Sequence, residues 1–202
     1  MKFVLATHNQ GKIRELHEIL GPLGIELEPL PSDFPEIEED GSSFEEDAKI
    51  KARTVCEALG VPAIADDSGL SVDALDGFPG IHSARWAGEG VNDHQRNQLL
   101  LVRMIAVPEA QRGARFICAA ACVFPDKREL CVRGECRGTI LGEERGASGF
   151  GYDPIFCVPE SSCTFGELEA DVKNSISHRA RAFNALGSAL RAQMDDLGEE
   201  IC

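Results

Sequence analysis

The stretch AIADDSGL, residues 63–70, places two adjacent acids, Asp66 and Asp67, at the end of a short apolar run. The run itself has the length and composition of a buried strand. A carboxylate buried at such a place without compensation costs free energy or takes up a proton. The sequence therefore predicts that a cation or a bound ligand compensates these two acids.

The chain before this stretch predicts alternating strands and helices. Residues 2–6 and 25–30 have the pattern of short strands. Between them, after the turn THNQG, apolar residues recur at helical spacing until Gly21-Pro22 ends the helix. Another helix is expected over 44–59, followed by the strand PAIAD. The apolar positions expected to face the core are Ile13, Leu16, Ile19 and Leu20 in the first helix, and Ala48, Ala52, Val55 and Leu59 in the second.

The chain after this stretch predicts longer strands. Asn92 and Gln95 have the spacing of a capping box, which starts a helix expected to run to about residue 105. RFICAAACVF (115–124) and ELCVRGECRGTI (129–140) read as an antiparallel pair. A last amphipathic helix follows Ser177, with its apolar face at Ala182, Phe183, Leu186, Ala189, Leu190 and Met194. The fold class is therefore mixed α/β.

Length and composition limit the classes of function. The chain has 202 residues, 43% of them hydrophobic, which suits one sizeable core or two closely packed lobes. A net charge of −14 argues against sequence-independent binding to nucleic acid, because such binding needs a basic surface. The eight cysteines do not follow zinc-ligand spacing, and we expect reduced thiols in a cytoplasmic protein. No apolar stretch approaches the roughly 20 residues that span a bilayer.

Two stretches suggest a site for a phosphorylated ligand with a metal ion. ATHNQGKIREL, residues 6–16, puts a turn and Lys12 where a strand gives way to a helix, whose free N–H groups attract phosphate. It is not a Walker A loop, because Ala6 and Ile13 stand where that motif needs Gly and Ser or Thr. Acids at 36–40 and at 66–67 could supply the one or two carboxylates that Mg²⁺ prefers.

Two further stretches suggest contacts with a base. GASGFGYDPIF, residues 146–156, surrounds Phe150 and Tyr152 with glycines, and a ring held on such a loop can stack on a base. A β-turn with core aromatics is the alternative interpretation. KNSISHRARA, residues 173–182, gathers Lys173, His178 and Arg179 at a helix start, where cations oppose the helix dipole. An incoming anion or a carbonyl-bearing base would explain these cations better.

Together, these motifs resemble the inosine triphosphate pyrophosphatase family. The resemblance rests on TxNxxK, an acidic loop with F..DA..KA, ADDSGL.VDAL.G.PG..SAR, GFGYDPIF and SHR, in this order, from Leu5 to about Leu190. It implies one domain over residues 1–202 with two lobes, an elongated central mixed sheet and an active-site cleft between the lobes. It also implies a homodimer and Mg²⁺-dependent hydrolysis of non-standard purine nucleoside triphosphates (ITP, dITP, XTP) to the monophosphate and pyrophosphate.

The resemblance assigns a role to each motif. Glu39 and Asp67 would bind the metal, and Asp67 would also take the proton of the attacking water, with Asp66 as a supporting partner. Ser68 would touch the substrate beside Asp67. The residues implied in contact with the phosphates are Thr7, His8, Asn9, Gln10, Gly11, Lys12 and Lys51, and those implied in contact with the nucleotide, chiefly its base, are Phe150, Gly151, Tyr152, Asp153, Lys173, His178 and Arg179.

Three alternatives remain open at this point. The chain could be a house-cleaning pyrophosphatase for other modified nucleotides, such as modified pyrimidines. It could be a non-catalytic nucleotide sensor, although a sensor has little use for a general base such as Asp67. A hydrolase built on Ser68, His82 and Asp153 is allowed by composition, but the sequence has no G-x-S-x-G elbow.

Overall fold

The computed structural model describes residues 2–199 of the chain and the side chains of residues 2–193. Seven strands form one sheet in the order β2-β1-β3-β4-β5-β6-β7. The sheet is mixed: β1 pairs parallel with β2 and β3, whereas β6 pairs antiparallel with β5 and β7. The strands are β1 Lys2–Leu5, β2 Glu26–Pro29, β3 Ala63–Val72, β4 Gly113–Val123, β5 Glu129–Ile140, β6 Phe156–Val158 and β7 Cys163–Thr164.

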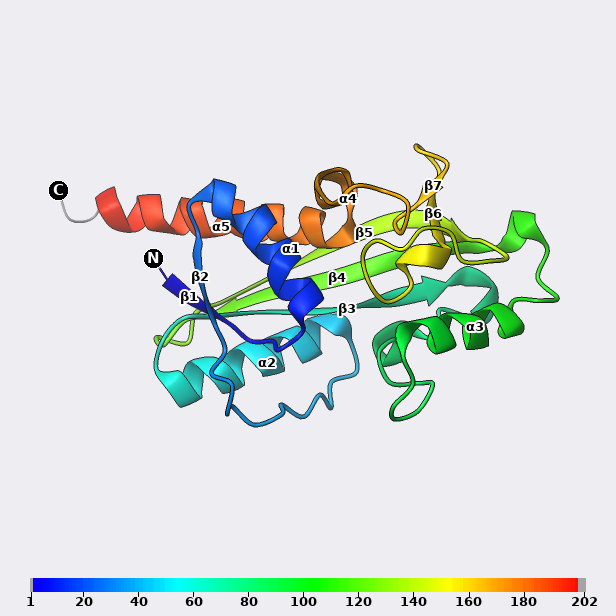
Figure 1. Cartoon of the computed structure of the whole chain (residues 1–202). Helices are drawn as coiled ribbons and strands as arrows, with labels where there is room; N and C mark the ends of the chain where they lie inside the picture. The colour runs from blue at the N-terminus through cyan, green and yellow to red at the C-terminus, as the bar shows by residue number, and fades with distance from the viewer. Residues whose placement is uncertain (1, 200–202) are drawn as a thin grey trace. The chain divides into compact units, whose positions relative to one another are not determined.

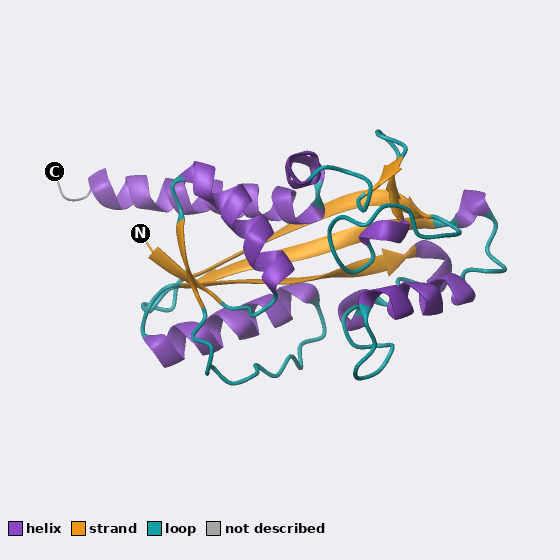
Figure 2. Cartoon of the chain, in the orientation of Figure 1, coloured by secondary structure: helices purple, strands orange, loops and turns teal. Residues whose placement is uncertain are grey.

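Five α-helices accompany the sheet in the described part of the chain (Figures 1 and 2). They are α1 Gln10–Leu20, α2 Phe44–Leu59, α3 Asp93–Arg103, α4 Ala170–Ile176 and α5 His178–Glu199. None of the described helices is long and apolar enough to cross a membrane. The mixed α/β fold class is therefore confirmed.

The chain divides into two compact units, each with its own core. Unit 1 comprises residues 1–67, 118–134 and 179–202, and unit 2 comprises residues 68–117 and 135–178. In unit 1, α1 and α5 lie on one face of the strands and α2 on the other (Figure 1). The core of unit 1 includes Phe3, Leu5, Leu16, Ile64, Phe183 and Leu186; the core of unit 2 includes Leu70, Leu100, Met104, Phe116, Phe156 and Phe165.

Local sequence explains where two helices of unit 1 begin and end. Asn9 is the N-cap of α1, because its side chain accepts a hydrogen bond from Lys12 N. Ser43 caps α2 in the same way through Glu46 N, and α2 ends at Gly60, whose φ of 68° favours glycine. The helix predicted over 44–59 is thus confirmed, as is the end of α1 before Gly21.

The structure corrects several details. β3 does not end at Asp66 but continues to Val72, because Leu70 and Val72 are also buried. Leu59 is 36% exposed and does not face the core. α3 keeps the predicted capping box, yet it ends at Arg103. The pattern did not predict α4, β6 or β7, which are short. The side chain of Met194 lies outside the described part of the last helix.

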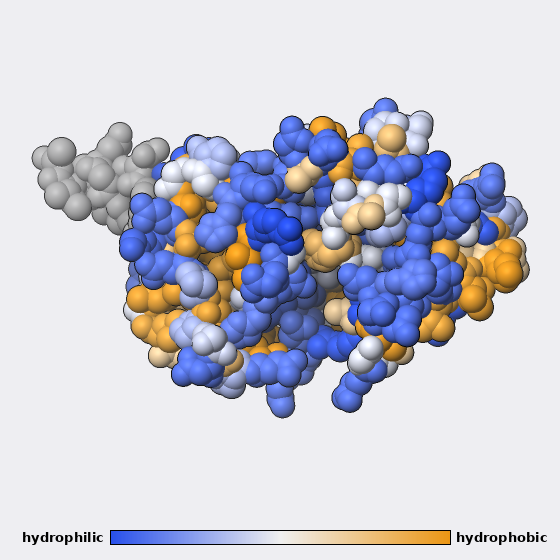
Figure 3. All heavy atoms as spheres, in the orientation of Figure 1, coloured by the Kyte–Doolittle hydropathy of each residue, from blue (hydrophilic) through white to orange (hydrophobic). Residues whose placement is uncertain are grey.

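The predicted strand pair 115–124 and 129–140 corresponds to β4 and β5, which are neighbours in the sheet. A tight turn joins them, in which Phe124 N donates to Arg128 O. None of the seven described cysteines forms a disulfide, whereas Cys202 lies outside the described residues. On the face in view, Figure 3 shows a mostly hydrophilic surface, in keeping with the net charge of −14.

Candidate functional site

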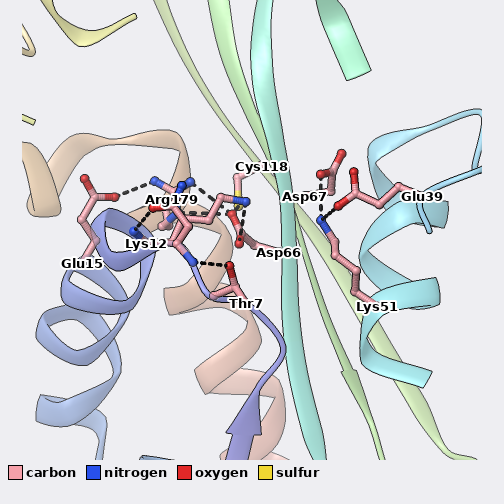
Figure 4. Close-up of polar contacts among 10 residues, drawn as sticks. Thr7, Lys12, Glu15, Glu39, Lys51, Asp66, Asp67, Cys118 and Arg179 are labelled. Carbon is pink, nitrogen blue, oxygen red and sulfur yellow. Dashed lines mark hydrogen bonds and ion pairs between the residues drawn. The ribbon is translucent and has the colours of Figure 1, made fainter. Parts of the chain in front are cut away.

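Asp66 and Asp67 lie inside β3 and point to opposite faces of it (Figure 4). Successive side chains of a strand alternate between the two faces of a sheet. Both acids are buried, with 1% and 7% of their surface exposed. Each acid therefore needs its own compensating partners, and unit 1 supplies them from different helices.

Cations from α1 and α5 compensate Asp66. Lys12 Nζ lies 3.0 Å from Asp66 Oδ1, and Arg179 Nη2 lies 3.1 Å from Asp66 Oδ2. Arg179 also donates from Nη1 to Glu15 Oε2 at 2.6 Å. Burial acts to raise the pKa of Asp66, but Lys12 and Arg179 outweigh it and hold that pKa well below its usual range. Asp66 thus stays ionised and holds the side chains of Lys12 and Arg179 in place.

The turn before α1 is held by its own side chains, which accept hydrogen bonds from two backbone N–H groups. Asn9 N donates to Thr7 Oγ1 at 3.2 Å, and Asn9 Oδ1 accepts from Lys12 N at 3.1 Å. His8 and Gln10 are exposed, and Gln10 and Gly11 begin the first turn of α1. The positive end of the helix dipole is therefore accessible next to a lysine, which is an arrangement suited to an anion.

Lys51 of α2 compensates Asp67 on the other face of β3. Its Nζ lies 2.9 Å from Asp67 Oδ1 and 2.9 Å from Glu39 Oε1. Burial acts to lower the pKa of Lys51, but Asp67 and Glu39 outweigh it, so the ammonium stays charged. The structure thus brings together two acids and a lysine that lie far apart in sequence.

Asp67 has a different environment from Asp66. Burial raises the pKa of Asp67, and the charges of Lys51 and Lys12 offset this only in part. Within the described residues, Asp67 Oδ2 is buried and has no hydrogen-bond partner. Adjacent carboxylates with opposite pKa shifts are suited to different roles, one as a fixed anion and one as a base or ligand.

Glu39 and Asp67 fit a magnesium ion. Both contact the same ammonium group, so their oxygens converge on one place, and Asp67 Oδ2 offers a further buried oxygen. Mg²⁺ typically takes one or two carboxylates and completes its shell with waters and substrate phosphates. The described residues contain no cluster of three or more typical metal ligands, so such an ion would depend on its substrate for the rest of its shell.

In unit 2, the glycine-rich loop is held by an ion pair. Asp153 Oδ2 accepts from Phe150 N at 2.8 Å and from Lys173 Nζ at 2.5 Å. Both partners of the pair are nearly buried, with 2% and 4% of their surface exposed. Lys173 Nζ also lies 5.0 Å from the centre of the Phe150 ring, which is half-buried. Asp153 and Lys173 therefore shape the loop that carries Phe150.

Tyr152 anchors the same loop to the segment around Trp86. Trp86 Nε1 donates to Tyr152 Oη at 2.6 Å, and Tyr152 Oη donates to Ser83 O at 2.7 Å. Ser83 Oγ in turn accepts from Leu70 N of β3 at 2.8 Å. Tyr152 is thus part of the packing beneath the loop. Ser68 is half-buried on β3, two residues before Leu70.

His178 and Arg179 are neighbours in sequence but have separate partners. The His178 ring stacks on Phe116 of unit 2 at 4.6 Å between ring centres and is 4% exposed. Arg179 belongs to unit 1, where Asp66 and Glu15 take its donors. Glu15 was not predicted as a site residue, although its spacing of three residues from Lys12 on one helix indicated that the two side chains lie on the same side of α1.

Sequence comparisons identify related proteins. The family model described as the Ham1 family matches residues 3–189. A dITP/XTP pyrophosphatase from Geobacter sulfurreducens is 47% identical over 188 residues, which are 92% of this chain and 94% of that protein. Another dITP/XTP pyrophosphatase, from Desulforamulus reducens, is 49% identical and covers 90% of this chain and 92% of its own length.

A structural comparison agrees with them. The solved structure of a HAM1 protein from Coxiella burnetii matches with a TM-score of 0.86 and 41% identity, over 95% of this chain and 99% of that one. The fold, the acidic and cationic site and these relatives together define an enzyme class, the hydrolases that act on acid anhydrides. Within that class, the chain belongs to the Ham1 family.

Proposed function

We propose that this chain hydrolyses the non-standard purine nucleoside triphosphates dITP, XTP and ITP to the monophosphate and pyrophosphate, with Mg²⁺ as cofactor. The observation that carries the proposal is the group formed by half-buried Glu39 with buried Lys51 and Asp67, in which Asp67 Oδ2 is left for a ligand. The names of the relatives from Geobacter sulfurreducens and Desulforamulus reducens support the choice of dITP and XTP.

The phosphates would bind at the start of α1, along Thr7 to Lys12, and at Lys51. The accessible N–H groups of the first helical turn and the ammonium of Lys12 both favour negative charge. Asp66 keeps the Lys12 side chain in place through its 3.0 Å ion pair. All triphosphates share these contacts, so this part of the site would provide affinity but not base selectivity.

Asp67 would accept the proton of the water that attacks the α-phosphorus. Its free Oδ2 is the described oxygen best placed for this role, and the neighbouring Lys51 stabilises the negative charge that develops on the phosphates. Glu39 and Asp67 would hold Mg²⁺, which supplies positive charge for the leaving pyrophosphate and makes a bound water more acidic. Ser68 would contact the substrate beside Asp67.

The base would be recognised by the glycine-rich loop and by His178, which both belong to unit 2. Phe150 is half-buried whereas Tyr152 is buried, so Phe150 is the ring of that loop that we propose stacks on the base. Hypoxanthine and xanthine carry a 6-oxo acceptor where adenine carries an amino donor, so buried donors would favour the former. His178 and backbone N–H groups of the loop are the proposed donors, whereas the guanidinium of Arg179 already donates to Asp66 and Glu15.

A substrate panel tests this proposal. Purified protein with Mg²⁺ should release pyrophosphate from dITP, XTP and ITP much faster than from the standard triphosphates, and EDTA should abolish the release. Preference for a modified pyrimidine triphosphate would favour the alternative house-cleaning function. Binding without any release of pyrophosphate would favour a nucleotide sensor. A sensor, however, would leave the buried Asp67 without a role.

We further propose that residues 1–202 act as one domain in a cytoplasmic homodimer. The outer side of α3 and the segment after it expose Leu99, Val102 and Ile105, with 44%, 66% and 82% of their surface accessible. Exposed apolar side chains at helical spacing are typical of a protein interface. Sedimentation velocity should show a dimer that Val102→Glu with Ile105→Glu dissociates, and a monomeric wild type would contradict this proposal.

A further inference from the structure

The loop that carries Phe150 has a third support, which the sequence motifs do not reveal. Gly151 N donates to Asp93 Oδ2 at 2.6 Å, and Gly151 O accepts from Asn97 Nδ2 at 3.1 Å. Both polar backbone atoms of a single loop residue are thus bound by side chains of one helix, α3. Asp93 and Asn97 are one helical turn apart and belong, like Gly151, to unit 2.

The backbone of the loop requires such support. Gly149 and Gly151 have φ angles of 75° and 63°, so Phe150 stands between two residues in the left-handed region. A Cβ on Gly149 would lie 2.0 Å from Asp153 Oδ2, so this side of the loop tolerates no side chain. Glycines also have many alternative conformations in solution, and hydrogen bonds to a rigid helix are one way to select a single one.

Asn97 also reaches the beginning of the loop. Its Nδ2 donates to Glu144 Oε1 at 2.8 Å, and exposed Gln98 donates to Glu144 Oε2 at 3.1 Å. Asn97 therefore joins residue 144 to residue 151 through one amide group. The two residues that Asn97 contacts thus lie on either side of the glycine-rich segment that contains Phe150.

Fold stability alone does not explain Asn97. The residue is 1% exposed and lies three residues before Leu100 on the buried side of α3. Within the described residues, its Oδ1 is buried without a hydrogen-bond partner, which is unfavourable for folding. An apolar residue at this position would avoid that cost, so the amide is better explained by what its Nδ2 holds.

We propose that Asp93 and Asn97 are positioning residues that set base selectivity by fixing Gly151, and with it the Phe150 ring. This inference rests on the proposed function, because it takes Phe150 and its neighbours as the base-binding loop. Neither residue touches the reacting atoms. Loss of either side chain should weaken binding of the base. It should therefore change KM and the preference among bases more than kcat.

Kinetics on five variants test the inference. Asn97→Ala and Asp93→Ala should raise KM for XTP and lower the preference for XTP over ATP by about tenfold, which corresponds to 1.4 kcal/mol. Asp93→Asn should behave like the wild type, since an amide oxygen still accepts from Gly151 N. Asn97→Asp should not, because a carboxylate cannot donate to Gly151 O and lies against Glu144. Gln98→Ala, which contacts Glu144 but not Gly151, is the matched control and should keep the wild-type preference.

Trp86 provides a second readout that does not depend on turnover. It is the only tryptophan of the chain, and it donates to Tyr152, the residue after Gly151. Its emission should change in Asn97→Ala and Asp93→Ala but not in Gln98→Ala. Asp93 is exposed, so Asp93→Ala remains informative even if Asn97→Ala does not fold.

The outcomes separate this inference from the proposed function. A wild type that releases no pyrophosphate from XTP, dITP or ITP would overturn the proposed function together with this inference. An active wild type whose Asp93→Ala and Asn97→Ala variants keep the preference for XTP would overturn the inference alone. Equal proportional losses for XTP and ATP, with a lower melting temperature, would also overturn it, because they indicate support of the fold only.

Discussion

At the scale of single residues, the two adjacent acids of β3 show how position on a strand determines chemistry. Asp66 faces Lys12 and Arg179, whereas Asp67 faces Lys51 and Glu39 (Figure 4). The resulting opposite pKa shifts leave Asp66 ionised and make Asp67 the stronger base. A test of the proposed mechanism therefore begins with Asp67.

Asp67→Asn should fold normally and lose nearly all turnover. An amide cannot accept the proton of the attacking water and is a weaker ligand for Mg²⁺. We expect kcat to fall more than about 100-fold, equivalent to ~2.7 kcal/mol, with a melting temperature close to that of the wild type. Steady-state release of pyrophosphate measures this, with Asp126→Asn, at an exposed position of the 124–128 turn, as control. Retention of more than a tenth of wild-type kcat would show that Asp67 is not the base.

Lys12→Ala and Lys51→Ala should weaken the use of every triphosphate to a similar degree. Both lysines are proposed to meet phosphates, which all substrates share, so the preference for ITP over ATP should stay nearly constant. The measurement is kcat/KM for both nucleotides. Lys2→Ala is the control, since Lys2 pairs with Glu28 on the surface. A large change in preference would instead place these lysines at the base.

Arg179→Ala tests two roles at once. If the guanidinium reads the 6-oxo group, kcat/KM for ITP should fall about ten- to a hundredfold, or ~1.5–3 kcal/mol, while the rate with ATP changes little. The contacts with Glu15 and Asp66 add a structural effect, because removing one partner of a buried ion pair costs about 3–5 kcal/mol.

A thermal melt and kinetics on both nucleotides separate these roles. We expect a clear loss of stability in Arg179→Ala and a partial recovery of stability in Arg179→Lys, which keeps the charge. Exposed Arg191→Ala on the same helix should change neither quantity. Equal proportional losses for ITP and ATP would exclude a role of Arg179 in reading the base.

At the scale of elements, the start of α2 holds the acidic loop that carries Glu39. Asp47 Oδ1 accepts from Gly41 N at 2.9 Å, and Glu46 Oε2 accepts from Ser42 N at 2.7 Å. The first turn of the helix thus binds the end of the loop two residues after Glu39. A change in this contact should therefore weaken metal binding more than it disturbs the rest of the fold.

Gly41→Ala should disturb this contact. A Cβ on Gly41 would lie 2.7 Å from Asp47 Oδ1 and 2.9 Å from Glu46 Cβ, so the loop must shift. We expect a loss of about 1–3 kcal/mol in unfolding free energy and a higher Mg²⁺ concentration for half-maximal activity. Gly21→Ala is the matched control, because its Cβ would meet nothing within 4 Å. Identical Mg²⁺ dependence in both variants would argue against a role of this contact in placing Glu39.

At the scale of the whole molecule, a buried thiol and a buried phenol make the free energy of unfolding depend on pH in the alkaline range. Burial raises the pKa of the Cys122 thiol to about 12, and it also raises the pKa of Tyr152 to about 12. In the unfolded chain these groups lose their protons near pH 8.5 and 10, respectively. Across these windows the folded protein keeps protons that the unfolded chain has lost, so stability falls as pH rises.

Tyr152→Phe should remove part of this loss of stability at alkaline pH. The variant lacks the phenol, so its unfolding free energy should decline less than that of the wild type between about pH 10 and 12. Urea denaturation at a series of pH values measures the difference, and Cys122 serves as an internal control that both proteins share. Parallel profiles for the two proteins would contradict the raised pKa of Tyr152.

The sequence by itself determined much of the fold and predicted the residues of the candidate site. Apolar periodicity and capping residues such as Asn92 and Ser43 are local signals, so α1, α2, α3, β1 and the neighbours β4 and β5 could be predicted from short windows. The short elements α4, β6 and β7 could not, because they have too few residues for a period to show. The continuation of β3 past Asp66 was missed because two charges within a strand resemble its end.

Only the tertiary structure decided which partners each site residue has. The ion pairs of Arg179 with Glu15 and Asp66, and of Lys51 with Glu39 and Asp67, join positions far apart in the chain, and no local pattern encodes such distances. The hydrogen bonds of Asp93 and Asn97 to Gly151 are of the same kind. Residue types give the chemistry that is possible, whereas burial and distance, which arise only when the sheet brings these segments together, decide which acid stays charged and which lysine it holds.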